Sequence, residues 1–357
     1  MFNVCVVIGA RPNYIKAWPI LKKIENSDIW KSHLVHSGQH YDRNLADDLL
    51  NELQFPKIKT QLTLSDKSNA SSRYSSLHNN FKKFFSEKVF NAVIVFGDVN
   101  TTVAATLAAK NAKQYVVHVE SGLRSFDVTM PEEINRIIVD NWSDLLITTE
   151  ASANENLKLE GFEQSQIAFC GNPMIETLIR NSELWKYDRF AEPYILSTIH
   201  RAETIHSKEN LRKVFEKLLV LSSKKRIILP IHPATRSQLK KFDLDYVLNS
   251  ENIEVIEPLT YLKFLNFMWN SEGILTDSGG VQEEAVFMKK RVVTLRPNTE
   301  RPSTLSTGLN ILMPIKNFSV NKCLDHMACK DQQDHFLPNW DSNVAHRVLT
   351  NIRERIR

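Results

Sequence analysis

The chain has 357 residues, of which 42% are hydrophobic and 24% are charged, with aromatic residues along its whole length. This composition excludes a chain that is disordered throughout, and the length predicts about two domains. The 45 Lys and Arg residues exceed the 41 Asp and Glu residues by only four, and both signs are mixed along the chain. That balance excludes a dedicated nucleic-acid surface, although a local anion pocket remains compatible with it.

The four cysteines, Cys5, Cys170, Cys323 and Cys329, form no CxxC pair and have no His-rich companion segment. We therefore interpret them as free thiols of a reducing compartment, and not as a zinc site or a disulfide framework. The printed sequence leads directly into its first apolar run, without a basic leader, and no apolar run approaches the ~18 residues of a membrane helix. We expect a cytoplasmic protein.

Short apolar runs alternate with longer amphipathic stretches, which is typical of βαβ units around a parallel sheet. The expected strands are Val4–Ile8, His33–His36, Ala92–Phe96, Tyr115–His118 and Leu145–Thr148, then Tyr194–Thr198, Arg226–Pro230, Ile253–Ile256, Gly273–Leu275 and Arg291–Leu295. Two such sets predict an α/β fold with two Rossmann-like domains. Gly171 and Pro173 interrupt the pattern, so we place the domains at residues 1–170 and 171–338, followed by a C-terminal helix in 339–357.

The first strand leads into Gly9-Ala-Arg-Pro-Asn-Tyr-Ile-Lys16. A single glycine does not make a dinucleotide fingerprint. Pro12 suits the first turn of a helix, and Arg11 would then lie at that helix's N-terminus. Arg11 and Lys16 are candidate phosphate ligands, or else an ordinary solvated pair.

Two carboxylates follow expected strands in the first half. Asp98 comes after Ala92–Phe96, and Glu120 stands 22 residues later, after Tyr115–His118. If these strands are neighbours, both acids lie at one edge of the sheet, roughly 5 Å apart. Two such close carboxylates do not both ionise cheaply, so we expect one to act as a base and the other as an acid.

A third acidic segment, Met130-Pro-Glu-Glu-Ile-Asn-Arg136, begins a helix. Acidic residues in a first turn commonly serve only to complement the helix dipole. We assign that role to Glu133. A functional role for Glu132 comes from the resemblance described below.

The second half contains a candidate phosphate cradle, in which a strand ends and Ser278, Gly279 and Gly280 lead into a helix. Backbone N–H groups and the positive end of the helix dipole would face a diphosphate there. Glu284, one turn later, is either a ribose ligand or a surface glutamate. His200 with Arg201, His232 and Arg301 also follow expected strands, and they are candidates because several such groups converge.

Nine segments together closely resemble the non-hydrolysing UDP-N-acetylglucosamine 2-epimerases. They are GARPNYIK, SGQHYD, FGDVNTT, HVESGLRS, MPEEINR, GNPMIETL, TIHRAET, TDSGGVQEEA and TERP, in the family's order, from Gly9 to about Leu312. The resemblance implies two Rossmann-like domains of the GT-B type with an interdomain active site, and a C-terminal helix that crosses back to the first domain. It also implies elimination of UDP to 2-acetamidoglucal and its re-addition with the opposite configuration at carbon 2. Other implications are a homodimer, no metal or redox cofactor, no nucleic-acid or membrane partner, and a role in bacterial surface polysaccharide synthesis.

The resemblance also implies roles for individual residues. Asp98, Glu120 and Glu132 resemble the family's catalytic acids, with His200 close to the diphosphate. Arg11, His200, Ser278, Gly279, Gly280 and Arg301 look like diphosphate ligands, Phe264 and Glu284 match positions that contact uracil and ribose, and Lys16, Arg136 and His232 match further substrate-binding residues.

Some segments depart from the family pattern. The usual second arginine after the histidine is Ala202 here, and Gln39-His40 is followed by Tyr41-Asp42. These departures put allosteric activation by a second UDP-N-acetylglucosamine in doubt. The family also includes epimerases for related sugars, such as diacetamido-uronic acid derivatives, so the sugar itself is left open.

Three alternatives stay open at this point. A hydrolysing 2-epimerase would release N-acetylmannosamine and UDP. A GT-B glycosyltransferase would share the cradle without requiring Asp98, Glu120 and Glu132. A non-catalytic nucleotide-sugar-binding regulator would retain binding alone.

Overall fold

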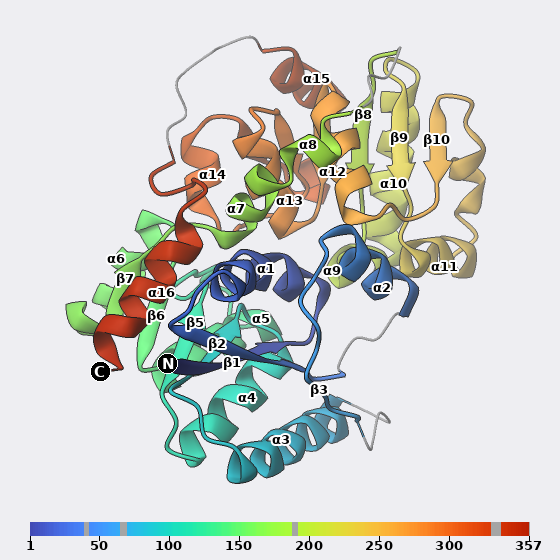
Figure 1. Ribbon diagram of the computed structural model, residues 1–357. Coiled ribbons are helices and arrows are strands. Elements are labelled where there is room, and N and C mark those ends of the chain that lie inside the picture. The colour runs from blue at the N-terminus through green and yellow to red at the C-terminus, as the bar shows by residue number, and fades with distance from the viewer. Residues whose placement is uncertain (39–42, 65–69, 188–191, 330–336, 357) are drawn as a thin grey trace. The chain divides into compact units, whose positions relative to one another are not determined.

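Residues 1–38, 43–64, 70–187, 192–329 and 337–356 are described by a computed structural model of the chain (Figure 1). Their contacts divide the chain into two compact units. Unit 1 comprises Met1–Asn181 and Leu337–Arg357, and unit 2 comprises Ser182–Phe336. Each contains its own parallel sheet.

The sheet of unit 1 has seven parallel strands in the order β3-β2-β1-β4-β5-β6-β7. Strands β2 and β3 lie on one side of β1, and β4 to β7 lie on its other side. The point between β1 and β4 is therefore the switch point of a doubly wound fold. The strands are β1 (Phe2–Ile8), β2 (Trp30–His36), β3 (Thr60–Gln61), β4 (Ala92–Phe96), β5 (Val116–Val119), β6 (Leu145–Thr148) and β7 (Ile167–Phe169).

Helices cover both faces of this sheet, with α1 on one face and α3 and α4 on the other (Figure 1). Because both faces are covered, β4 is buried along its whole length, and its sequence is a continuous apolar run. The helical elements are α1 (Arg11–Glu25), α2 (Arg43–Glu52), α3 (Ala70–Glu87), α4 (Asn100–Asn111), α5 (Pro131–Trp142), α6 (Ala151–Leu159), the 3₁₀ helix η1 (Gln164–Gln166), α7 (Pro173–Arg180) and α16 (Val344–Arg355).

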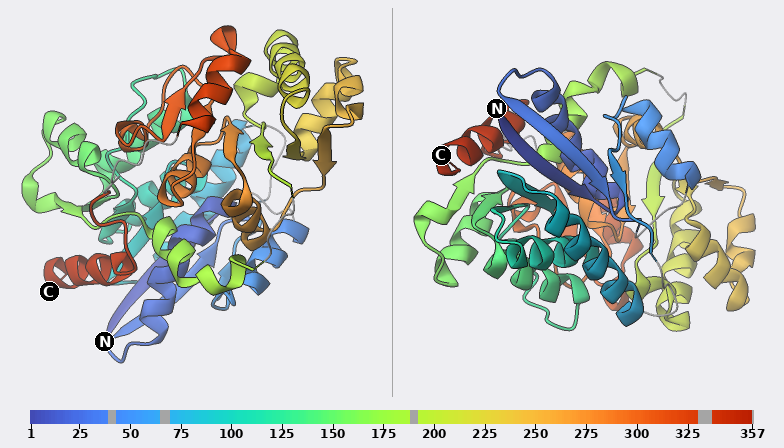
Figure 2. Two further views of the ribbon diagram at one scale, coloured as in Figure 1. Left: turned by 90° about the horizontal axis from the view of Figure 1, so that it is seen from above. Right: turned by 60° about the horizontal axis from the view of Figure 1, so that its bottom comes forward.

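Helices α7 and α16 both belong to unit 1 and pack against α1 and each other. The Thr177 hydroxyl donates to the Ile15 carbonyl, and the buried Glu176 carboxylate accepts from the Ala345 N–H at 2.6 Å. Figure 2 shows α16, in red at the C-terminus, near the N-terminus in both views. The division of the chain therefore falls after Asn181, eleven residues beyond the boundary that the glycine and proline pattern suggested.

The sheet of unit 2 has six parallel strands in the order β10-β9-β8-β11-β12-β13, which is the Rossmann order. The strands are β8 (Ile195–Thr198), β9 (Ile227–Pro230), β10 (Ile253–Ile256), β11 (Gly273–Thr276), β12 (Val292–Thr294) and β13 (Asn310–Leu312). The helical elements are α8 (Ser182–Trp185), α9 (Ala202–Ile205), α10 (Lys208–Ser222), α11 (Pro233–Lys241), η2 (Asp245–Asn249), α12 (Tyr261–Asn270), α13 (Gly279–Phe287), α14 (Pro302–Ser306), η3 (Ile315–Asn317) and α15 (Val320–Ala328).

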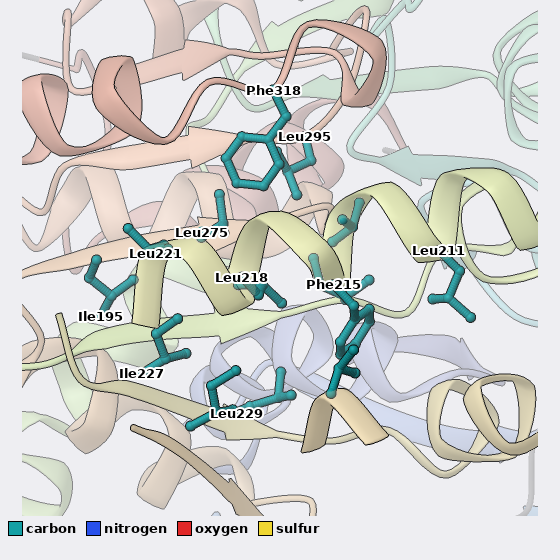
Figure 3. Packing of buried hydrophobic residues seen from close by; sticks show 14 of the residues in the cluster. Ile195, Leu211, Phe215, Leu218, Leu221, Ile227, Leu229, Leu275, Leu295 and Phe318 are labelled. Atoms are coloured by element: carbon teal, nitrogen blue, oxygen red, sulfur yellow. The ribbon is translucent and has the colours of Figure 1, made fainter. Parts of the chain in front are cut away.

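The core of unit 2 forms where α10 packs on its sheet (Figure 3). Leu211, Phe215, Leu218 and Leu221 recur at helical spacing and are at most 1% exposed. They meet apolar side chains of the strands, labelled Ile195, Ile227, Leu229 and Leu275 in Figure 3. This core holds the ends of β8 and β11 in fixed positions.

The ten strands expected from the sequence are all present, with ends that differ by three residues or fewer. The short strands β3, β7 and β13 were not expected. Within the described ranges, no helix combines the length and the apolar character that a membrane crossing requires. All four cysteines are free, and three of them are buried.

Candidate functional site

Asn13, near the start of α1, forms hydrogen bonds with both chain segments at the switch point of unit 1. Its side-chain oxygen accepts from the N–H groups of Gly9 and Ala10, and its amide nitrogen donates to the Phe96 carbonyl at 3.1 Å. Asn13 therefore joins the turn after β1 to the end of β4. Arg11 is half-buried at the first position of α1, where the sequence placed it.

Lys16 and Glu120 form a buried ion pair, although they lie 104 residues apart in the chain. A Cβ atom on Gly97 would lie 2.9 Å from the Glu120 carboxylate, so this close approach requires glycine. Glu120 itself has φ 76°, a conformation that non-glycine residues rarely adopt and that often marks functional sites. Lys16 thus binds a carboxylate, whereas the sequence suggested a phosphate.

Arg136 brings two further carboxylates together. Its Nη2 atom lies 2.7 Å from Oδ2 of Asp98, and its Nη1 atom lies 2.6 Å from Oε2 of Glu133. Arg136 is buried, whereas the Asp98 side chain is 27% exposed. Asp98 is therefore held in place by a cation while its carboxylate stays accessible.

Glu133 lies in the first turn of α5, as expected, and it also has partners outside the helix. Glu133 is only 1% exposed and accepts hydrogen bonds from the N–H groups of Ser125 and Phe126 as well as from the Ser125 hydroxyl. Glu133 therefore fixes the loop that precedes α5. Glu132, its neighbour, is half-buried and lies one helical turn before Arg136.

The strands β4 and β5 are neighbours, as the sequence analysis assumed, with Phe96 opposite Val119. Asp98 and Glu120 consequently follow adjacent strands at the carboxyl edge of the sheet. Each acid also has a cationic partner of its own, because Asp98 contacts Arg136 and Glu120 contacts Lys16. The division into one base and one acid stays a prediction.

In unit 2, the switch point lies between β8 and β11 and is held by Asp277. This carboxylate is fully buried and accepts from the backbone N–H groups of His200 and Arg201 at 3.0–3.1 Å. The His200 Nδ1 atom lies 3.4 Å from the same carboxylate, and its ring centroid is 6.0 Å from that of His232. The His200 side chain is 40% exposed, whereas the Nδ1 atom of His232 accepts from the Ala234 N–H at the start of α11.

Helix α13 begins directly after Ser278 and presents Gly279 and Gly280 in its first turn. The Arg301 guanidinium lies so close that a Cβ atom on Gly279 would be 2.7 Å from it. Arg301 is buried and pairs with Glu283 and Glu300. A helix N-terminus with a fixed guanidinium beside it is suited to an anion.

A second buried arginine shares Glu300 with Arg301. Arg296 is 4% exposed, and its Nη2 atom lies 3.0 Å from Glu300. Burial lowers the pKa of Arg296, and the nearby charges of Arg201 and Arg301 lower it further against the opposing effect of Glu300. Each of these arginines is paired with at least one glutamate, so the region holds its guanidinium groups in fixed positions.

Glu284 is buried, which removes the interpretation of it as a surface glutamate. Its Oε1 atom accepts from the Tyr261 hydroxyl at 2.9 Å. Phe264 follows Tyr261 by three residues on α12, so the two lie on one side of that helix, and Phe264 is half-buried. The two positions implied for uracil and ribose are therefore connected through Tyr261.

Sequence reasoning missed Asn13, Tyr261, Asp277 and Arg296. Asp277 carried a readable signal, because it stands directly between a strand and the Ser-Gly-Gly segment. Tyr261 gave none, since its partner Glu284 is 23 residues away. Arg296 pairs with Glu300 only four residues later, but the sequence does not show that both are buried. The segment Gln39-His40-Tyr41-Asp42, on which the doubt about allosteric activation partly rests, lies outside the described residues.

Two doubly wound units, one with clustered carboxylates and one with a cation-lined helix N-terminus, define an enzyme of the GT-B-like α/β class. The family model described as UDP-N-acetylglucosamine 2-epimerase matches residues 22–353. The chain belongs to the UDP-N-acetylglucosamine 2-epimerase family. This membership confirms both the resemblance and the predicted enzyme class, an isomerase.

Two curated relatives illustrate the family. The chain is 38% identical to the UDP-N-acetylglucosamine 2-epimerase of Methanocaldococcus jannaschii over 352 residues, covering 95% of this chain and 94% of the relative. It is 34% identical to the UDP-2,3-diacetamido-2,3-dideoxy-D-glucuronate 2-epimerase of Pseudomonas aeruginosa, covering 87% and 88%.

Solved structures confirm the predicted fold. The crystal structure of the Methanocaldococcus jannaschii UDP-GlcNAc 2-epimerase in complex with UDP-GlcNAc and UDP has a TM-score of 0.90, with 34% identity and 99% of each chain covered. A glycosyltransferase of kitacinnamycin has a TM-score of 0.60 at 11% identity over 99% of this chain and 94% of that one, a likeness of fold alone.

Proposed function

We propose that this protein interconverts UDP-N-acetylglucosamine and UDP-N-acetylmannosamine without net hydrolysis. A base removes the proton from carbon 2, the bond from carbon 1 to UDP breaks, and a double bond between carbons 1 and 2 forms 2-acetamidoglucal. UDP then adds back to carbon 1 while a proton returns to the opposite face of carbon 2. The observation that carries the proposal is the set of three acids, Asp98, Glu120 and Glu132, gathered around β4, β5 and α5 in a chain of this family.

The carboxylates of unit 1 take the proton-transfer roles. Asp98 is accessible and held by Arg136, Glu120 is held by Lys16, and Glu132 lies one turn before Arg136. Positioned carboxylates of this kind transfer protons effectively because their geometry is set before the substrate arrives. We assign the proton transfers to these three carboxylates as a group and not to individual residues.

Unit 2 takes the nucleotide. The diphosphate binds the N–H groups of Ser278, Gly279 and Gly280 at the start of α13 together with Arg301 and His200. These groups stabilise the negative charge that grows on UDP as it leaves, which lowers the barrier to elimination. Phe264 stacks on uracil, and Glu284 accepts from the ribose hydroxyls.

A diacetamido-uronic acid derivative of UDP is a second candidate substrate. The 34% identity to the Pseudomonas aeruginosa enzyme for that sugar supports it. Both candidates share the same chemistry at carbons 1 and 2, so the residue roles above serve either one. A homodimer and a role in surface polysaccharide synthesis are further parts of the proposal that follow from the resemblance. A cytoplasmic location is a further part that follows from the sequence composition.

Incubation with UDP-N-acetylglucosamine alone tests this function. We expect UDP-N-acetylmannosamine, with UDP retained on the sugar. Free N-acetylmannosamine with an equal amount of UDP would favour the hydrolysing alternative. No reaction unless an acceptor is supplied would favour a glycosyltransferase, and binding without any reaction would favour a regulator. Parallel incubation with the diacetamido-uronic acid derivative compares the two substrates.

A further inference from the structure

A buried charged network lies behind the carboxylates of unit 1. His118 on β5 and Asp140 on α5 are both fully buried, and the His118 Nδ1 atom lies 2.7 Å from Oδ1 of Asp140. Arg124 contacts the other oxygen of Asp140 at 2.7 Å and also pairs with Glu160. The buried Asp140 carboxylate therefore has the Arg124 guanidinium as a cationic partner, as a buried charge requires.

Each ring nitrogen of His118 faces a hydrogen-bond acceptor. Burial alone would raise the pKa of Asp140, but the hydrogen bond and charge of His118, together with Arg124, lower it, so Asp140 is an acceptor only. The Nε2 atom of His118 faces the Gly97 carbonyl at 2.9 Å, and a carbonyl is also an acceptor only. The ring therefore connects the Asp140 carboxylate on α5 to the Gly97 carbonyl after β4.

The network attaches to both turns that carry the reacting acids. His118 holds the carbonyl of Gly97, the residue directly before Asp98. Asp140 accepts from the Gly122 N–H at 3.1 Å, two residues after Glu120. Gly97 and Gly122 both have positive φ, so neither turn follows a conformation that the chain adopts by default.

Helix α5 extends the same arrangement to the third acid. Glu132, Arg136 and Asp140 recur at intervals of four residues and lie along one side of α5. Arg136 contacts Asp98, and Asp140 contacts both His118 and the turn after Glu120. Because Asp140 holds α5 against β5, it also fixes how far Glu132 lies from the other two carboxylates along the axis of α5.

We propose that His118 and Asp140 are positioning residues, which set the spacing of Asp98, Glu120 and Glu132 by holding the turns after β4 and β5 to one side of α5. The inference rests on the proposed function for the identity of the reacting acids. It adds a buried histidine ring that acts on the reacting acids through the Gly97 turn and through α5. A displacement of about 1 Å at reacting groups can cost on the order of 100-fold in rate, so the loss of this hold should appear in the proton-transfer step.

Two substitutions separate the two contacts of the ring. His118→Gln places an amide nitrogen near the former Nε2 atom, where it can still donate to Gly97. His118→Asn places an amide near the former Nδ1 atom, where it can contact Asp140 but does not reach Gly97. His33→Asn is a matched control, because His33 on β2 packs against Phe84 and Phe90 in the same unit and bonds Thr60.

The readout is kcat together with the kinetic isotope effect for UDP-N-acetylglucosamine deuterated at carbon 2. We expect His118→Asn to lower kcat by about 10- to 100-fold and to enlarge the isotope effect, with UDP affinity unchanged. His118→Gln should recover much of the loss, and His33→Asn should leave the isotope effect as in the wild type. An unchanged isotope effect in His118→Asn, or equal losses in the Asn and Gln variants, would overturn the inference.

A measurement without substrate keeps the inference separate from the proposed function. Proton NMR of histidine-labelled protein, with the signal assigned through His118→Gln, should show an Nε2–H of His118 that exchanges slowly with solvent, as its bond to the Gly97 carbonyl requires. An Nε2–H that exchanges as fast as those of exposed histidines would overturn the inference even in an active enzyme. Failure of the wild-type protein to convert either UDP-sugar would overturn the proposed function. The NMR result would then decide alone whether His118 makes its contact with Gly97.

Discussion

The Nη2 atom of Arg136 lies 2.7 Å from Oδ2 of Asp98, so the helix that carries Glu132 is bonded directly to the turn after β4. Glu120 follows the neighbouring strand and pairs with Lys16 of α1. Two cations from different helices thus define where the acids stand, and each acid can be tested separately.

Asp98→Asn and Glu120→Gln preserve shape but remove a group that accepts or donates a proton. General acid–base groups contribute about 100- to 10,000-fold, so each variant should lose turnover by that order. Calorimetry should show UDP affinity close to that of the wild type, because the nucleotide ligands lie in unit 2. Glu25→Gln, on the surface of α1, serves as a control. Near-normal turnover in either variant would remove that residue from the mechanism.

Glu132 and Glu133 are adjacent, but their substitutions should have different effects. The change at Glu132 should lower turnover, and the change at Glu133 should lower the free energy of unfolding. Glu133→Ala leaves the buried Arg136 without one partner, and breaking a buried pair costs about 3–5 kcal/mol of unfolding free energy. Glu132→Gln should reduce turnover on the order of 100-fold. Its effect on stability should stay within about 0.5 kcal/mol.

Urea unfolding and turnover measured on both variants test this pair. If Glu132→Gln proved the more destabilising of the two, or retained full activity, the assignment of Glu132 to chemistry and Glu133 to structure would be reversed.

Uridine recognition should depend on Phe264. Base–aromatic stacking is worth about 1–3 kcal/mol, so Phe264→Ala should weaken UDP binding by roughly 5- to 150-fold in calorimetry. Tyr246→Ala removes an exposed aromatic side chain elsewhere in unit 2 and should leave the affinity unchanged. Equal affinities for the wild type and Phe264→Ala would mean that uracil binds elsewhere.

Arg301 requires a gentler substitution, because its removal would leave Glu283 and Glu300 without their cation. Arg301→Lys keeps the charge and loses the planar fork. We expect UDP affinity to fall about tenfold, equivalent to about 1.4 kcal/mol, while the free energy of unfolding changes less. A larger effect on folding than on UDP would assign Arg301 to structure alone.

Unit 1 should lose stability in mild acid. Burial lowers the pKa of His36 to about 4, and burial together with Lys88 and Lys59 lowers the pKa of His33 to about 4. Because these values lie below the unfolded value of 6.5, the unfolded chain binds protons first. Stability is therefore fully present above pH 6.5 and decreases as the pH falls toward 4.

Urea unfolding at pH 7, 6 and 5 measures this loss. His33→Phe keeps an aromatic ring against Phe84 and Phe90 but takes up no proton, so its stability should fall less steeply over the same range. A loss as steep as that of the wild type would show that His33 does not contribute.

The long buried strands could be predicted from the sequence, because strands covered on both faces are continuous apolar runs, as in Ala92–Phe96. It did not reveal β3, β7 or β13, which have two or three residues each and lack enough length for a pattern. Asp98 and Glu120 were accessible to prediction because each directly follows a strand.

The roles of Glu133 and His118 were not accessible, because they depend on burial and on partners from other elements. Glu133 bonds a loop that precedes its own helix, and His118 bonds a carboxylate 22 residues away. An acidic residue in a first turn and a histidine inside a strand have ordinary interpretations until the packing is known.

The most direct test of the proposed epimerisation is conversion of UDP-N-acetylglucosamine in heavy water, followed by proton NMR. Removal and return of the carbon 2 proton predict deuterium at carbon 2 of both UDP-sugars, a fixed final ratio approached from either side, and no build-up of free N-acetylmannosamine. Epimer that retains its original hydrogen at carbon 2, or sugar released in step with UDP, would contradict the account.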